Sequence, residues 1–118
     1  MLLQSEDKLL VVHRRLFERD GSRFFIGRVE DFDAGIVRVA GYTFVRDPVG
    51  GTVSRKNDVR TKLFSLSSGT LMAYVLPRDL DLTSARLVAD EASLTLTAGS
   101  SFRMDLSEWA HSAYMRVG

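Results

Sequence analysis

Alternation of apolar and polar residues with a period of two dominates this chain, and helical periodicity is scarce. The pattern predicts short antiparallel strands joined by tight turns. In the first of them, Val11-Val12 and the following Asp20-Gly21 favour a strand ending in a hairpin. The spacing of Leu9, Val12 and Leu16 also matches a short helix there. We expect strands over residues 8–17, 24–31, 36–46, 59–67, 70–76, 85–89, 93–98 and 102–106, and residues 52–56 could continue the hairpin after residue 46.

Turn-forming residues separate these segments. We expect turns at Asp20-Gly21, at Asp33-Ala34-Gly35, over residues 47–51 and at Ser68-Gly69, because glycine tolerates positive φ and aspartate bonds nearby backbone amides. Pro77 has no amide hydrogen for a sheet and should end the strand before it.

The end of the chain allows two interpretations. Asp105 and Glu108 have the spacing of a capping box, which predicts a short helix over residues 106–115. The alternative is a frayed end. Trp109, Tyr114 and Met115 are apolar groups on a segment too short for a core of its own, so we expect them to dock on the rest of the protein or on a neighbouring subunit.

These elements predict an all-β protein. We expect a small, strongly bent five-stranded antiparallel barrel over residues 8–77, and a β-meander extension over residues 78–118 packed on or beside it. Gly27 is placed to let its strand bend. Turn or bend positions are Gly21, Gly27, Asp33, Gly35, Gly69 and Pro77.

Composition excludes several classes of site and protein. A length of 118 residues with 45% hydrophobic and 26% charged residues fits one globular unit. The chain has no cysteine, which excludes disulfides, thiolate metal sites and cysteine nucleophiles. No apolar run approaches the roughly 20 residues that span a bilayer, and the acidic start lacks the basic leader of an export signal. We expect a cytoplasmic protein.

The net charge of +1 conceals an asymmetry. Residues 8–62 hold 12 Lys and Arg against 7 Asp and Glu, whereas residues 63–118 hold 4 against 6. The first half could favour a polyanion or an acidic partner, or could simply present a solvated face of mixed charge.

Two glycine-containing segments carry a resemblance. The run from Asp20-Gly21 through Gly27 to Phe32-Asp33, and the run from Gly69 to Pro77, resemble the two sequence boxes of the Sm/LSm family. The resemblance covers about residues 8–77 and implies a bent small barrel, ring assembly by strand pairing and RNA binding. The alternative is another small β-barrel, of the SH3-like or OB type, or an open β-sandwich. It fails where the family contacts RNA, because an asparagine is replaced by Val37 and a basic residue by Ser68.

A basic stretch offers another route to RNA. Arg60, Lys62 and Phe64 alternate along one expected strand, and a basic row beside an aromatic ring can hold phosphates and stack a base. The alternative is an edge strand protected from aggregation by its charge. The candidate nucleic-acid residues are Arg55, Lys56, Arg60, Lys62 and Phe64.

The resemblance also implies that subunits join edge to edge through strands 59–67 and 70–76. The candidate interface residues of a homo-oligomer are Leu71, Ala73, Tyr74 and Val75.

Candidate catalytic groups are few. His13 and His111 lie far apart in sequence, and the acidic residues near the turns are more typical of turn formers than of acid–base pairs. We therefore expect no catalytic residue, no metal, no cofactor, no small-molecule substrate and no membrane partner. Three functions stay open. The first is an Sm-like oligomeric module that binds single-stranded RNA, and the second is a protein-interaction module without nucleic acid. The third is a small enzyme with a pocket lined by His13, Asp31 or Asp33.

Overall fold

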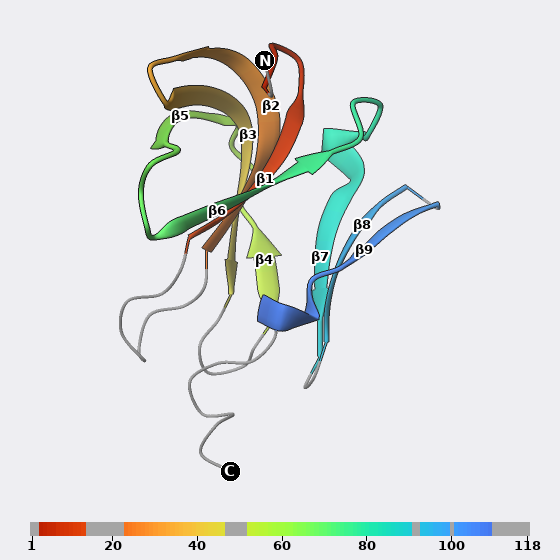
Figure 1. Cartoon of the computed structure of the whole chain (residues 1–118). Coiled ribbons are helices and arrows are strands. Elements are labelled where there is room, and N and C mark those ends of the chain that lie inside the picture. The colour runs from red at the N-terminus through yellow and green to blue at the C-terminus, as the bar shows by residue number, and fades with distance from the viewer. Residues whose placement is uncertain (1–2, 14–22, 47–51, 91–92, 100, 110–118) are drawn as a thin grey trace.

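The computed structural model describes residues 3–13, 23–46, 52–90, 93–99 and 101–109, and these form two antiparallel sheets (Figure 1). The main sheet has six strands: β1 Lys8–His13, β2 Arg23–Asp33, β3 Ile36–Arg46, β4 Val53–Arg55, β5 Arg60–Ser65 and β6 Leu71–Leu76. The second sheet is a meander of β7 Ala85–Ala89, β8 Leu94–Ala98 and β9 Phe102–Asp105. The all-β class and the C-terminal meander are thus confirmed.

The order of the main sheet is β4-β3-β2-β1-β6, and β5 also pairs with β3. The short β4 lies against residues 44–46 of β3 and β5 lies against residues 36–41, so the two strands follow one another along β3. The main sheet therefore has one strand more than the five expected, and the additional strand β4 lies within residues 52–56, the segment expected as a continuation of the hairpin.

The middle of the sheet bends sharply at two facing glycines. Gly27 of β2 pairs with Gly41 of β3, and a Cβ on Gly41 would lie 2.1 Å from the carbonyl oxygen of Ile26. Two residues further along β2, the pairing register shifts between Val29 and Asp31, which is a β-bulge. Glycine at both positions and the bulge allow the strands to approach and bend. The bend expected at Gly27 fits this geometry.

A tight turn joins β2 to β3. Ala34 and Gly35 both have positive φ, of 51° and 82°, as two-residue hairpin turns of the I′ type require. The turn expected at Asp33-Ala34-Gly35 is therefore confirmed. Gly21 and the turn expected over residues 47–51 lie outside the described residues.

The main sheet is apolar on both faces. Alternate residues of β1 enter two different cores, which is why its sequence Leu-Leu-Val-Val is continuously apolar. Leu9 and Val11 lie in an inner core, inside the curl of the main sheet. Phe64 of β5 and Leu71 of β6 pack against this core. Both edges of the curled sheet thus contribute to the same cluster.

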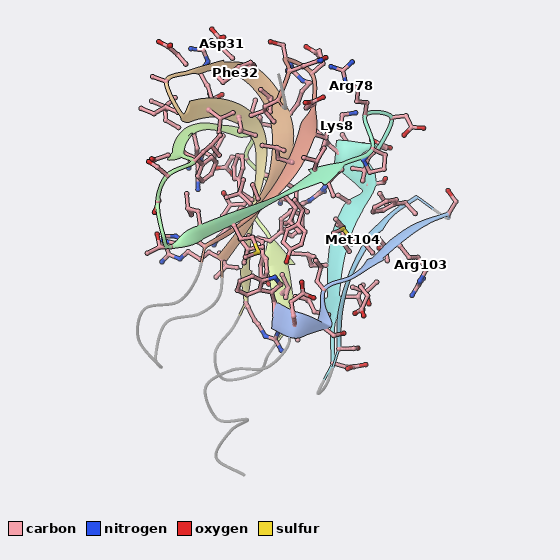
Figure 2. All side chains as sticks on the ribbon, in the orientation of Figure 1. Lys8, Asp31, Phe32, Arg78, Arg103 and Met104 are labelled. Atoms are coloured by element: carbon pink, nitrogen blue, oxygen red, sulfur yellow. The ribbon has the colours of Figure 1, made fainter. Side chains whose placement is uncertain are left out.

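The other face of the main sheet packs against the meander. This inter-sheet core joins Leu10 and Phe24 of the main sheet to Leu94 and Leu96 of β8, all at most 1% exposed. Figure 2 shows Met104 of β9 on the side facing the main sheet and Arg103 pointing away from it. The strict alternation of β8 and β9 follows from having one buried face.

The meander ends in a short 3₁₀ turn, η2 Ser107–Trp109. The side chain of Asp105 accepts a hydrogen bond from the amide of Ser107, and the amide of Trp109 bonds the carbonyl of Leu106. Of the short helix expected over residues 106–115, the described residues form only this 3₁₀ turn, because the amide of Leu106 bonds the carbonyl of Leu94 of β8. Tyr114 and Met115 lie outside the described residues.

Trp109 docks on the main sheet, as expected for this tail residue. Its indole nitrogen donates to the hydroxyl of Tyr74 at 2.7 Å, and that hydroxyl donates to Glu108 at 2.6 Å. Arg46, only 5% exposed, reaches the carbonyl of Trp109. Burial and the nearby carboxylate of Glu108 raise the pKa of Tyr74. None of the helical segments among the described residues has the length and apolarity needed to cross a membrane.

Candidate nucleic-acid interface

A half-open hollow of about 450 Å³ lies at the end of the inner core, where β1 ends and β2 begins. Its polar lining is basic apart from one hydroxyl: His13, Arg23, Thr43, Lys56 and Lys62. Its apolar lining comes from valines and phenylalanines: Val11, Phe24, Phe25, Val45 and Phe64. We call this site the basic hollow.

Strand register brings these residues together from four parts of the sequence. His13 of β1 lies opposite Arg23 of β2, and Phe25 lies opposite both Val11 of β1 and Thr43 of β3. Residues of one strand alternate between faces, so Arg23 and Phe25 share a face of β2. The same rule places Lys62 and Phe64 on one face of β5, where they pair with Val39 and Val37 of β3.

The cations of the basic hollow lack acidic partners among the described residues. The ion pairs between described residues involve Arg28, Arg38, Arg60 and Arg78. None of them involves Arg23, Lys56 or Lys62. Burial lowers the pKa of Lys62, and the positive charges of Arg23 and Arg60 lower it further. Positive charges that repel one another are stabilised by an anion placed between them.

Aromatic rings form one wall of the hollow. The ring centroids of Phe25 and Phe64 lie 5.4 Å apart, and the Lys62 ammonium lies 5.1 Å from the centroid of Phe25. Phe25 is buried, whereas Phe64 is half-buried and keeps part of its ring accessible. A partly exposed ring beside cations is the combination that binds single-stranded nucleic acid by stacking and charge.

A shallower groove continues from the hollow. It shares Thr43, Lys56 and Lys62 with the hollow and adds Arg60, Thr61 and Asp58. Here a carboxylate is present, and it already pairs with Arg60 at 3.0 Å. The groove therefore extends the basic surface with a weaker net charge.

The predicted nucleic-acid residues fall into two groups. Lys56, Lys62 and Phe64 line the basic hollow, and Arg60 lies in the adjoining groove. Arg55 lies elsewhere: its guanidinium is 4.7 Å from the ring centroid of Tyr42 and donates to the carbonyl of Thr83. Tyr42 packs against the inter-sheet core, so Arg55 belongs to the contact between the sheets.

Sequence reasoning missed Arg23 and Phe25 as lining residues, and it proposed His13 only for an enzyme pocket with Asp31 or Asp33, neither of which lines the basic hollow. The signal in the sequence was alternation along each strand. His13 is two positions after Val11, and Arg23 is two positions before Phe25, so each pair shares a face of its strand. The pairing register of β1 with β2 decides that His13 and Arg23 meet, and alternation alone does not fix a register.

The positions that the Sm/LSm resemblance singles out do not line the basic hollow. Val37 is fully buried in the inner core, and Ser68 shares a hydrogen bond with Thr70. Asp33 lies at the far end of β2 from Arg23, and Figure 2 shows Asp31 and Phe32 at that same end. Gly69 has open space around it and Pro77 directly follows β6.

The predicted interface residues are divided between the two faces of β6. Ala73 and Val75 are exposed, Val75 by 67%, whereas Tyr74 packs against the inter-sheet core and Leu71 against the inner core. Among the described residues, β6 pairs along one edge only, with β1, and β5 pairs along one edge only, with β3. The outer edges of β5 and β6 are therefore left for partners.

Histidine and acidic side chains are dispersed among the described residues. They contain no group of three or more His, Asp or Glu side chains able to hold a metal ion. Among them, His13 makes no hydrogen bond to a carboxylate and lies near cations instead. Glu30 and Asp31 both face Arg38, at 3.1 and 4.0 Å.

Comparison of the chain with protein-family models, with curated proteins and with solved structures found no match. The function is therefore inferred from the site itself.

Proposed function

We propose that this protein is a non-catalytic, Sm-like small β-barrel module that forms homo-oligomers and binds single-stranded RNA through the basic hollow. One observation carries the proposal: Arg23, Lys56 and Lys62 converge on a hollow beside a partly exposed Phe64, with no acidic partner among the described residues. RNA supplies the phosphates and the unstacked bases that such a surface attracts.

The strand order supports the small-barrel part of the proposal. A meander of β1, β2 and β3 continues into β5 on one side, and β6 returns to pair with β1 on the other. Phe64 of β5 and Leu71 of β6 then pack on one inner core. A bent sheet whose two edges share a core has the curvature of a small barrel.

Exposed apolar residues at the two free edges support assembly. Leu63 of β5 is 68% exposed and Val75 of β6 is 67% exposed. Pairing the β5 edge of one copy with the β6 edge of the next would satisfy both backbones and cover these side chains. Such a head-to-tail contact closes into a ring when its rotation allows.

The test of RNA binding is a salt titration with a short single-stranded RNA, measured by fluorescence anisotropy. Three phosphate contacts predict that the logarithm of the binding constant falls with the logarithm of salt concentration with a slope of about −2. Arg23→Gln should reduce that slope by about 0.7, while Arg103→Gln on the meander should leave it unchanged. Absence of binding at low salt would remove RNA from the proposal.

A second function, a protein-interaction module without nucleic acid, is favoured by the exposed apolar edges alone. Native mass spectrometry separates the cases when combined with the RNA titration. Oligomers that Val75→Lys dissociates, in a protein that binds no RNA, would establish this second function. A monomeric wild-type chain would contradict the assembly part of both.

A further inference from the structure

We propose that the basic hollow binds the phosphomonoester group of a nucleotide, with the base against Phe64. This inference deepens the proposed function where the nucleotide is the end of an RNA strand, and it holds independently where the nucleotide is free. The shared chemistry is a terminal phosphate carrying about two negative charges.

The shape of the site favours a terminal group. Cations approach from different sides: Arg23 from the start of β2, Lys62 from β5 and Lys56 from the segment between β4 and β5. A volume of about 450 Å³ falls within the roughly 300–1,000 Å³ of pockets that enclose most of a small ligand. A surface that only tracks a continuing backbone needs a row of charges, and the row through Arg60 lies in the adjoining groove.

The charge of the site favours a dianion. Arg23, Lys56 and Lys62 supply three positive charges without an acidic partner among the described residues, and His13 can add a hydrogen-bond donor. An internal phosphodiester carries one negative charge and would leave most of this charge uncompensated. The lowered pKa of Lys62, caused by burial and then by Arg23 and Arg60, shows the same excess.

The aromatic wall supplies the second half of a nucleotide site. Phe64 is half-buried against Phe25, which fixes the orientation of its ring, and the Thr43 hydroxyl lies in the same lining. Stacking on such a ring tolerates any base. We therefore expect the phosphate to contribute most of the binding free energy, and we expect little selectivity between bases.

The experiment uses the full chain and matched pairs of probes. Isothermal titration compares adenosine monophosphate with adenosine, and anisotropy compares one single-stranded RNA carrying a 5′-phosphate, a 3′-phosphate or hydroxyls at both ends. We expect the monophosphate to bind at least about tenfold more tightly than the nucleoside, because charge-assisted hydrogen bonds to phosphate are the strong ones. A phosphorylated RNA end should show a similar gain, and which end shows it identifies the natural orientation.

Variants locate the effect. Arg23→Gln and Lys62→Met should each abolish most of the gain from the phosphate, whereas Arg103→Gln should keep it. Arg23 is exposed, so its replacement leaves the core intact and keeps the test valid if Lys62→Met folds poorly. Circular dichroism checks the fold of each variant.

The outcomes separate this inference from the proposed function. RNA that binds equally well with and without an end phosphate, together with no preference for the monophosphate over adenosine, would overturn the phosphomonoester site and leave RNA binding in place. Monophosphate binding that depends on Arg23, in a protein that binds no RNA, would support the site and remove the RNA function.

Discussion

Gly27 and Gly41 face each other across β2 and β3, and neither position has room for a side chain. A Cβ on Gly27 would lie 2.5 Å from the carbonyl oxygen of Ala40, and one on Gly41 would lie 2.4 Å from the Cα of Gly27. Because these are backbone atoms, a methyl group there forces the two central strands apart. The bend that shapes the inner core, and with it the basic hollow, depends on this pair.

Gly41→Ala should therefore destabilise the protein by at least about 1–3 kcal/mol, the usual cost of overpacking. Gly69→Ala is the matched control, because open space surrounds Gly69 and its φ is not left-handed. Urea unfolding followed by circular dichroism measures both. Equal unfolding free energies for the two variants would show that the close approach is not what fixes the bend.

The hydroxyl of Tyr74 joins the 3₁₀ turn η2 to the main sheet. Tyr74→Phe should lower the unfolding free energy by about 1–3 kcal/mol, because the indole N–H of Trp109 loses its acceptor. It should also change the emission of the sole tryptophan. Tyr42→Phe is the control, since no described group hydrogen-bonds the hydroxyl of Tyr42. A wild-type emission spectrum in Tyr74→Phe would argue against the bond.

The two sheets should unfold as one unit, because the inter-sheet core takes residues from both. A chain ending at Pro77 loses the meander's half of that core, including Leu94 and Leu96. We expect it to bind a hydrophobic dye and to lack a cooperative unfolding transition, while a chain ending at Trp109 keeps the transition. A cooperatively folded 1–77 fragment would show instead that the first 77 residues are independent.

Acid should weaken the link between the sheets. Hydrogen bonds from the side chain and then the amide of Thr83 lower the pKa of Asp81 below its ordinary value of 3.8. A carboxylate with a lowered folded-state pKa contributes stability above its unfolded pKa and loses it as pH falls through the folded one. The stability difference between wild type and Asp81→Asn should thus be constant at neutral pH and shrink below about pH 4.

Asp79→Asn provides the comparison for this pH series, because the Asp79 side chain makes no hydrogen bond to any of the described residues. Thermal unfolding across the acid range measures all three proteins. A wild-type to Asp81→Asn difference that stays constant to pH 2 would contradict the contribution of Asp81.

Local pattern predicted most of the fold. The strands expected over residues 36–46 and 85–89 match β3 and β7 at both ends, because each has one clear alternating pattern and turn residues beside it. The segment 52–56 contains β4, but its place beside residues 44–46 of β3 and the bulge after Val29 were not predictable in the same way. Both depend on which strand lies alongside, and pattern does not encode that.

The candidate site was predicted only on its β5 side. Lys62 and Phe64 belong to one strand, so alternation alone placed them together. Arg23 and His13 also line the hollow, because β1 pairs with β2 in the register that sets these two residues opposite each other. Arg55 does not line it, because its side chain on β4 lies over the ring of Tyr42. The register of distant strands decides such a site, and a single sequence constrains it weakly.

Mapping the RNA contact on the folded protein tests the central claim most directly. Backbone amide chemical shifts would be recorded by nuclear magnetic resonance while single-stranded RNA is added to the isotope-labelled chain. We predict the largest changes at Arg23, Thr43, Lys62 and Phe64, around the basic hollow. Changes confined to Asp33 and its neighbours at the far end of β2 from Arg23, or no changes at all, would contradict the account.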